Sequence, residues 1–132
     1  MNETTQSSAG SKPQEYDLLI LGSGAAGKLI SWTLAKKGMK TAVIERKYIG
    51  GSCPNIACLP SKNVIHSAKV ASYFRRSEEF GMTKNNWKID MTGVRERKRK
   101  MVAGLVNVHL DFYKNSGAEL VMGTGRFIGP KT

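Results

Sequence analysis

The two cysteines of this 132-residue chain lie in one short segment, residues 50–62, which reads Gly-Gly-Ser-Cys-Pro-Asn-Ile-Ala-Cys-Leu-Pro-Ser-Lys. Two thiols at the spacing of Cys53 and Cys58 can close a small ring, either as a permanent staple or as a redox pair. A ring this small would add only about 2 kcal/mol of stability through the chain entropy of the unfolded state. Secreted folds that depend on disulfide staples also carry many cysteines. The spacing therefore favours a redox-active pair, with a structural pair as the alternative.

The second thiol, Cys58, lies just before Pro60, and proline favours the first position of a helix. The partial positive charge of a helix N-terminus would stabilise a thiolate there. A structural zinc site requires four ligands. His66 and His109 are the other nitrogen donors of the chain, and they are not spaced as a pair. The segment thus predicts thiol chemistry and no metal site.

A glycine-rich turn, residues 22–27 (Gly-Ser-Gly-Ala-Ala-Gly), lies earlier in the chain. The apolar run at 16–21 before it is typical of a buried parallel strand. After the turn, apolar residues recur at helical spacing until Gly38, and residues 41–45 resemble a second strand. A strand, glycine turn, helix and strand in this order predict a dinucleotide-binding unit, with a plain tight turn as the alternative.

Each glycine of this motif has a physical role in such a unit. Gly22 permits the tight turn, Gly24 lets the backbone approach a pyrophosphate, and Gly27 lets the helix pack closely on the strand. The helix N-terminus faces the phosphates. Glu45, at the end of the second strand, would accept hydrogen bonds from a ribose diol and would repel a 2′-phosphate. The pattern therefore favours FAD or NAD over NADP.

The rest of the chain alternates helices and strands. We expect residues 1–15 to be a disordered tail and 16–132 to form part of one domain. A helix is predicted over 63–76, with Val64, Ala68 and Ala71 on one face, and a loop over 78–91 in which Gly81 ends that helix. A long helix over 93–115 would follow an N-cap at Asp90 or Thr92 and would end at Gly117. Residues 118–122 are expected to form a third strand, and 123–128 another extended segment.

The net charge of +11 raises the question of nucleic-acid binding. Much of it comes from residues 95–100, inside the long predicted helix. The apolar residues of that helix trace the opposite face: Val94, Met101, Leu105, Val108 and Phe112. We therefore expect a solvated basic face and no nucleic-acid partner, since no aromatic residue lies among these charges. No apolar run has membrane-spanning length and no secretory signal is visible, so a cytoplasmic protein without a membrane partner is expected.

The glycine turn, Glu45 and the segment 50–62 together resemble the flavoprotein disulfide reductases, a family that includes dihydrolipoamide dehydrogenase, glutathione reductase and mercuric reductase. The resemblance runs from Tyr16 onward. It implies an α/β fold: a Rossmann-like FAD-binding domain with a parallel sheet, of which this chain holds the N-terminal half. It also implies that reducing equivalents pass from NAD(P)H through FAD to the cysteine pair, and then to a disulfide, a metal ion or a quinone.

The resemblance assigns roles to individual residues. Cys58 would lie beside the flavin, and Cys53 would be the thiol that exchanges with the substrate. Lys62 would lie near the flavin ring, Gly51 and Ser52 would hold the phosphate and ribose region, and Gly125 would meet the adenine. The complete set of expected cofactor-binding residues is Gly22, Gly24, Ala25, Ala26, Gly27, Glu45, Arg46, Gly51, Ser52, Cys58, Lys62 and Gly125.

Two features depart from the family pattern. Ala57 stands where glycine is usual, and Pro54 stands where a β-branched residue is frequent, and both lie inside the ring between the cysteines. The nicotinamide domain and the dimerisation domain are not in these 132 residues. We therefore expect the chain alone to be inactive and the full-length protein to be a homodimer. A non-catalytic FAD-binding module with a structural or regulatory cysteine pair is the alternative.

Overall fold

The computed structural model describes residues 13–83 and 86–132. Its centre is a parallel sheet of three strands in the order β1–β2–β3, so consecutive strands are neighbours. Leu18 pairs with Thr41, and Ala42 pairs with Glu119. The α/β class and the parallel sheet expected from the sequence are confirmed. The strands are β1 (Leu18–Leu21), β2 (Thr41–Glu45) and β3 (Glu119–Met122).

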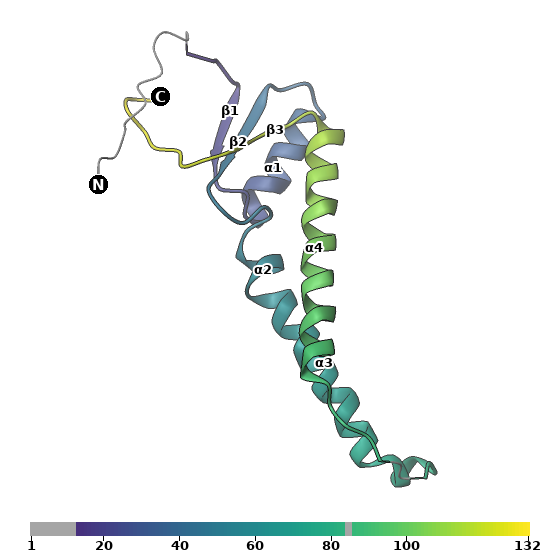
Figure 1. The fold of residues 1–132 in the computed structure, drawn as a ribbon. Coiled ribbons are helices and arrows are strands. Elements are labelled where there is room, and N and C mark those ends of the chain that lie inside the picture. The colour runs from purple at the N-terminus through teal and green to yellow at the C-terminus, as the bar shows by residue number, and fades with distance from the viewer. Residues whose placement is uncertain (1–12, 84–85) are drawn as a thin grey trace, which may run out of the picture.

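Two helices, α1 (Ala25–Ala35) and α4 (Met91–Ser116), pack against the sheet (Figure 1). Trp32 of α1 is the centre of this contact, because its ring stacks on Phe112 with centroids 4.8 Å apart and meets Tyr113 edge-on at 5.3 Å. Val43 of β2 lies fully buried beneath them. In β1, by contrast, Leu19 and Leu21 remain about half exposed on the other face of the sheet.

A pair of long helices projects from the sheet, formed by α3 (Cys58–Arg75) and the first half of α4 (Figure 1). The short helix α2 (Ser52–Asn55) leads into α3, and the 3-10 helix η1 (Ser77–Phe80) follows it. Arg97 joins the two long helices, since its guanidinium donates to the carbonyl oxygen of Asn63 and to the hydroxyl of Ser67, both at 2.6 Å.

The ends of α4 confirm the expected signals. The side chain of Asp90 accepts a hydrogen bond from the backbone N–H of Thr92, which makes Asp90 the N-cap. Gly117 adopts φ +79° and ends the helix. The prediction for Gly81 was wrong in one respect: this glycine, at φ +72°, ends η1, whereas α3 has already stopped at Arg75. Residues 123–128, expected as an extended segment, contain no strand and add none to the sheet.

The predicted faces of α3 and α4 differ from the buried ones. On α4 the buried residues are His109, Tyr113 and Ser116, while Val108 and Phe112 remain nearly half exposed. On α1 the buried residues are Ser31 and Trp32, and on α3 only Ala71 of the expected face is buried. Trp32 lies between α1 and α4, where its ring contacts His109, Phe112 and Tyr113, so one predicted residue and two others of α4 meet it.

The expected disordered tail lies mostly outside the described residues, which begin at position 13. The basic residues Arg95 and Arg99 of α4 are exposed, in agreement with a solvated face. Within the described ranges, no helix is long and apolar enough to cross a membrane.

Candidate functional site

The glycine turn lies at the carboxyl end of β1, where the backbone N–H of Gly22 donates to the carbonyl of Ile44 at 2.8 Å. Gly22 adopts φ +96°, a conformation that favours glycine. A side chain at Gly27 would collide with the carbonyl oxygen of Gly22, so the close packing of α1 on β1 requires glycine there. A side chain at Gly24 would meet open space.

The N-terminus of α1 is free to bind an anion. Gly24 is the N-cap residue and offers no side chain to the first-turn N–H groups, which have no acceptor within the helix. Ala25 and Ala26 are exposed at this end, beside an open groove that also borders Ile20 and Ile30. Free N–H groups, a positive helix end and a bare glycine backbone are the features that a pyrophosphate requires.

Glu45 ends β2 with its carboxylate almost fully buried at 8% exposure. One oxygen accepts from the N–H of Ser23 at 2.8 Å and from its hydroxyl at 2.7 Å. The other accepts from the N–H groups of Lys47 at 2.9 Å and Tyr48 at 3.1 Å. Burial alone would raise the pKa of Glu45, but the four hydrogen bonds outweigh it and lower the pKa to about 2. Glu45 is therefore ionised and holds the glycine turn against the chain after β2.

These four hydrogen bonds already use the roughly four lone-pair directions of the Glu45 carboxylate. They therefore leave no free acceptor site for the predicted contact with a ribose. A ribose hydroxyl at Glu45 would have to replace one of the present donors. The hydroxyl of Ser23 is the one that can leave, since it also lies 3.2 Å from the carbonyl oxygen of Tyr48. The contact of Glu45 with a ribose stays a prediction. Its second role, holding the glycine turn against the chain after β2, was not predicted from the sequence.

A cavity of about 340 Å³ opens at the carboxyl edge of the sheet, next to Glu45. Gly125 lies over the strand ends so closely that a side chain there would approach Cδ2 of Leu21 to 2.5 Å. Arg46 is exposed at the rim. The structure thus brings together three of the residues expected to hold the adenosine part of the cofactor. The lining consists of Leu21, Gly22, Ile44, Glu45, Arg46, Gly123, Thr124 and Gly125.

The segment that carries both cysteines, residues 50–62 (the cysteine segment), begins in contact with the glycine turn. Gly51 adopts φ +84°, and a side chain there would lie 2.7 Å from the Cα atom of Gly24. Its N–H donates to the carbonyl of Tyr48 at 2.7 Å, and the neighbouring Gly50 donates to the hydroxyl of Ser23 at 2.9 Å. Ser52 follows as the first residue of α2 and is exposed. The two motifs predicted from the sequence therefore form one continuous site.

Cys53 lies in α2, and Cys58 is the first residue of α3. The helix begins at the cysteine itself, two residues earlier than the proline signal at Pro60 suggested, and Ala57 provides no side-chain cap. The partial positive charge of α3 is thus available to the Cys58 sulfur. Asn55 holds the loop between the thiols, because its amide donates to the carbonyls of Ile49 at 2.9 Å and Gly51 at 2.8 Å.

Both cysteines are exposed free thiols. A hydrogen bond with Cys58 is the largest cause that raises the pKa of Cys53, followed by desolvation and the negative charge of Cys58. The charges of Lys28 and Lys62 act in the opposite direction. Lys62 is exposed one turn after Cys58 on α3. Ionisation of Cys53 is therefore opposed by Cys58 and favoured by two lysines.

Sequence reasoning missed three residues of this site. Ser23 lies within the glycine turn and Asn55 lies between the two cysteines, and both supply hydrogen bonds that shape the site although the sequence assigned them no role. Lys28 lies beneath the cysteine segment, with its ammonium 2.6 Å from Nε2 of His109. No spacing in the sequence links Lys28 to a histidine 81 residues away.

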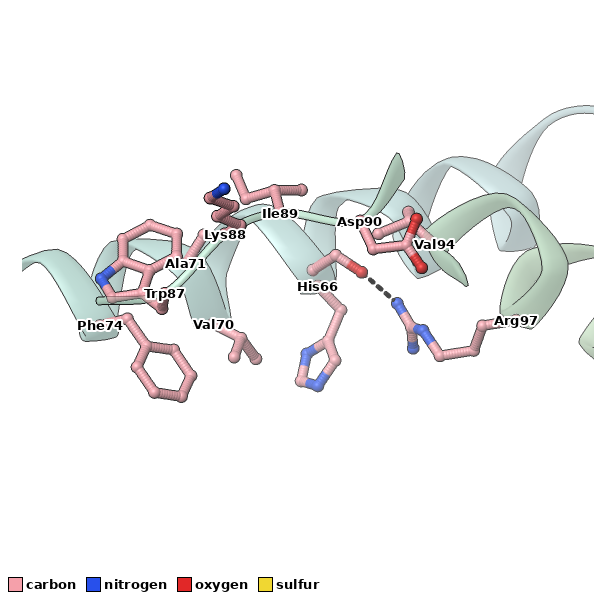
Figure 2. A pocket seen from close by; sticks show the side chains of 11 residues that line it. His66, Val70, Ala71, Phe74, Trp87, Lys88, Ile89, Asp90, Val94 and Arg97 are labelled. Atoms are coloured by element: carbon pink, nitrogen blue, oxygen red, sulfur yellow. Dashed lines mark hydrogen bonds between the residues drawn. The ribbon is translucent and has the colours of Figure 1, made fainter. Parts of the chain in front are cut away.

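A larger hollow of about 470 Å³ lies along α3, away from the glycine turn, and is drawn in Figure 2. Phe74 and Trp87 form its aromatic end, with ring centroids 5.8 Å apart. Figure 2 shows Arg97 at the opposite end, where its guanidinium reaches across to the hydroxyl of Ser67. None of the predicted cofactor-binding residues lines this hollow.

A family model described as pyridine nucleotide-disulphide oxidoreductase matches residues 16–132. The chain is 34% identical over 122 residues to a dihydrolipoyl dehydrogenase of Mycoplasma pneumoniae, covering 89% of this chain and 26% of that protein. It is 37% identical over 119 residues to the dihydrolipoyl dehydrogenase of Mycobacterium leprae, covering 89% of this chain and 25% of that protein. The chain thus spans about a quarter of the length of these curated relatives.

A solved structure has the same fold. It is the Cu(II) complex of the HOCl-induced flavoprotein disulfide reductase RclA from Escherichia coli, with a TM-score of 0.69 and 28% sequence identity. The match covers 89% of this chain and 23% of that chain.

Proposed function

Because this chain belongs to the pyridine nucleotide-disulphide oxidoreductase family, we propose that it is the FAD-binding and thiol-bearing part of an NAD(P)H-dependent flavoprotein disulfide reductase. The family implies FAD and NAD(P)H as cofactors. The observation that carries the proposal is the contact of Gly51 with Gly24, which sets the redox cysteines on the dinucleotide turn.

The site fits FAD in three respects. The uncapped N-terminus of α1 and the open backbone at Gly24 suit a pyrophosphate. The cavity beside Glu45 suits the adenosine, and the free thiols lie further along the same surface. The residues proposed to hold FAD are Gly22, Gly24, Ala25, Ala26 and Gly27 at the pyrophosphate; Glu45, Arg46 and Gly125 at the adenosine; and Gly51, Ser52, Cys58 and Lys62 toward the flavin.

When bound, FAD supplies the exchange of electrons between NAD(P)H and the cysteine pair. With a disulfide substrate, the Cys53 thiolate attacks one substrate sulfur and releases the other as a thiolate. The Cys58 thiolate then attacks the Cys53 sulfur, which releases the second substrate thiolate and forms the Cys53–Cys58 disulfide. The substrate gains two electrons and the cysteine pair loses two. Cys58 lies at the N-terminus of α3, where the helix end carries a partial positive charge.

We further propose a homodimer for the full-length protein and a cytoplasmic location. The reducing cytoplasm suits an isolated catalytic cysteine pair, since structural disulfides are rare there. The acceptor is proposed as a small molecule: a disulfide, a metal ion or a quinone.

The test combines cofactor binding with thiol oxidation in this chain. FAD binding, followed by the quenching of flavin fluorescence, is expected to weaken at least tenfold in Gly24→Asp, because a carboxylate would then face the pyrophosphate. A mild disulfide oxidant is expected to join Cys53 to Cys58, with a mass loss of two hydrogens. If FAD binds normally to Gly24→Asp, the proposed cofactor site is wrong. If the thiols never pair, the chain is a binding module without a redox role.

A further inference from the structure

Lys28 lies on the second turn of α1, directly under the cysteine segment, and is partly buried. Its ammonium lies 2.6 Å from Nε2 of His109 and 3.5 Å from the carbonyl oxygen of Gly50. Gly50 itself is packed against His109, since a side chain at Gly50 would lie 3.0 Å from the imidazole. A cation is therefore fixed between α1, α4 and the backbone that leads into Cys53.

The imidazole of His109 holds this cation without neutralising it. Nδ1 lies 2.6 Å from the carbonyl oxygen of Leu105, which can only accept, so Nδ1 carries the hydrogen. Nε2 is then an acceptor for the Lys28 ammonium. Burial, together with the charge of Lys28, lowers the pKa of His109 despite the bond to Leu105, so the ring is neutral near pH 7. His109 therefore orients Lys28 and leaves its charge unbalanced.

No carboxylate compensates Lys28 within residues 13–83 and 86–132, where the recorded ion pair joins Arg76 to Glu79. Burial lowers the pKa of Lys28, which shows that its charge is partly desolvated. The one anion that acts on it in return is Cys53, whose negative charge raises the pKa of Lys28. An ammonium with no carboxylate beside it thus has the exchange thiol as its electrostatic partner.

We propose that Lys28, oriented by His109, is a positioning residue that stabilises the thiolate of Cys53 for attack on the substrate. This inference rests on the proposed function, because it takes Cys53 as the exchange thiol. The charged and titratable groups that act on Cys53 are Cys58 and Lys62 of α3 and Lys28 of α1, which the neutral His109 of α4 holds in place. Cys58 opposes ionisation of Cys53 and the pKa of Cys53 is raised overall, while the charges of Lys28 and Lys62 reduce that rise.

The test follows the reactivity of Cys53 as a function of pH. In a Cys58→Ser background Cys53 is the single thiol, and its alkylation by iodoacetamide is measured from about pH 6 to pH 10. Lys28→Gln keeps a donor for His109 and removes the charge. Lys28→Arg keeps the charge. Lys36→Gln, at the exposed end of the same helix, is the matched control for net charge.

The expected result is a shift of the pH profile in Lys28→Gln alone. Loss of a close cation should raise the midpoint by about one pH unit. At neutral pH the rate should fall about threefold, because a more basic thiolate is also more nucleophilic and recovers about half of the loss. For the same reason, the alkaline plateau should rise. Lys28→Arg and Lys36→Gln should keep the original midpoint.

Identical profiles for Lys28→Gln and Lys36→Gln would overturn the inference. So would a rate that falls by one factor at every pH, which would indicate altered access to the thiol. A second measurement tests the Lys28 charge without mutating Lys28: the pH profile of Cys53 alkylation is recorded at increasing salt in a Lys62→Gln background. There the midpoint should rise as salt screens the Lys28 charge, and an unmoved midpoint contradicts the inference. If the pH profile of Cys53 alkylation depends on Lys28 but the chain binds no FAD, this inference holds and the proposed function is wrong.

Discussion

Ser23 and Glu45 are joined by two hydrogen bonds to a single carboxylate oxygen, one from the backbone N–H at 2.8 Å and one from the hydroxyl at 2.7 Å. The pair connects the glycine turn after β1 to the end of β2. The hydroxyl of Ser23 also accepts from the N–H of Gly50, so the same side chain supports the cysteine segment. Through this pair the cofactor turn and the thiol loop become one rigid unit.

We predict that Glu45→Gln destabilises the fold by about 2 kcal/mol. Glutamine has one acceptor oxygen, so its amide N–H₂ would face backbone donors that the carboxylate now satisfies. Thermal or urea unfolding measures the loss. Glu96→Gln makes the same charge change on the exposed side of α4 and should leave stability nearly unchanged. Equal stabilities of the two variants would show that the bonds to Glu45 contribute nothing.

The same carboxylate predicts an acid dependence. Its pKa of about 2 in the fold lies below the ordinary value of 4.5, so its stabilising effect is fully present above about pH 4.5 and is lost as the pH falls toward 2. The free energy of unfolding, measured by urea across this window, should therefore fall more steeply for the native chain than for Glu45→Gln. Parallel curves would contradict the assignment.

We predict that Gly51→Ala costs about 1–3 kcal/mol, because alanine rarely adopts the backbone angles that Gly51 has here. Its methyl group would also lie 2.7 Å from the Cα atom of Gly24, so the cysteine segment would lift from the turn and FAD affinity should fall as well. Gly104→Ala is the control, since its side chain would meet open space on helix α4. That variant should be as stable as the native chain or slightly more stable. A Gly51→Ala protein that unfolds and binds FAD normally would refute the contact.

We predict that Arg97→Ala loosens the α3–α4 pair and costs about 1–2 kcal/mol, because its guanidinium makes two hydrogen bonds to α3. Amide hydrogen exchange in the second and third turns of α3 should accelerate. Arg95→Ala removes an exposed charge from the same helix and should have almost no effect. Equal exchange rates in the two variants would show that Arg97 is only one of the solvated basic residues.

The sequence predicted those features that depend on a few neighbouring residues. The bounds of β2 agree with the expected strand, and Asp90 and Gly117 mark the ends of α4, because strand composition and helix caps are local signals. The glycine turn was also predicted correctly, since Gly22 has a positive φ and Gly27 packs closely against the carbonyl oxygen of Gly22. The cysteine pair and its helix end were visible for the same reason.

The rest depends on packing between distant segments. On α4 the apolar pattern left out His109 and Tyr113, whose partly polar side chains are buried because they pack against Trp32 of another helix. The bond between Ser23 and Glu45 and the contact of Lys28 with His109 require the folded chain to bring them together. The full set of bonds to Glu45 was hidden as well, because two of its donors are backbone groups of a loop after β2.

The central claim is that FAD lies across the glycine turn with Cys58 beside the flavin. The most direct measurement is the absorption spectrum of the FAD-loaded chain, reduced without oxygen by a dithiol that opens the Cys53–Cys58 disulfide. We predict a long-wavelength charge-transfer band that is lost in Cys58→Ser and kept in Cys53→Ser. A band that persists in Cys58→Ser, or bound FAD without any such band in the native chain, would contradict the account.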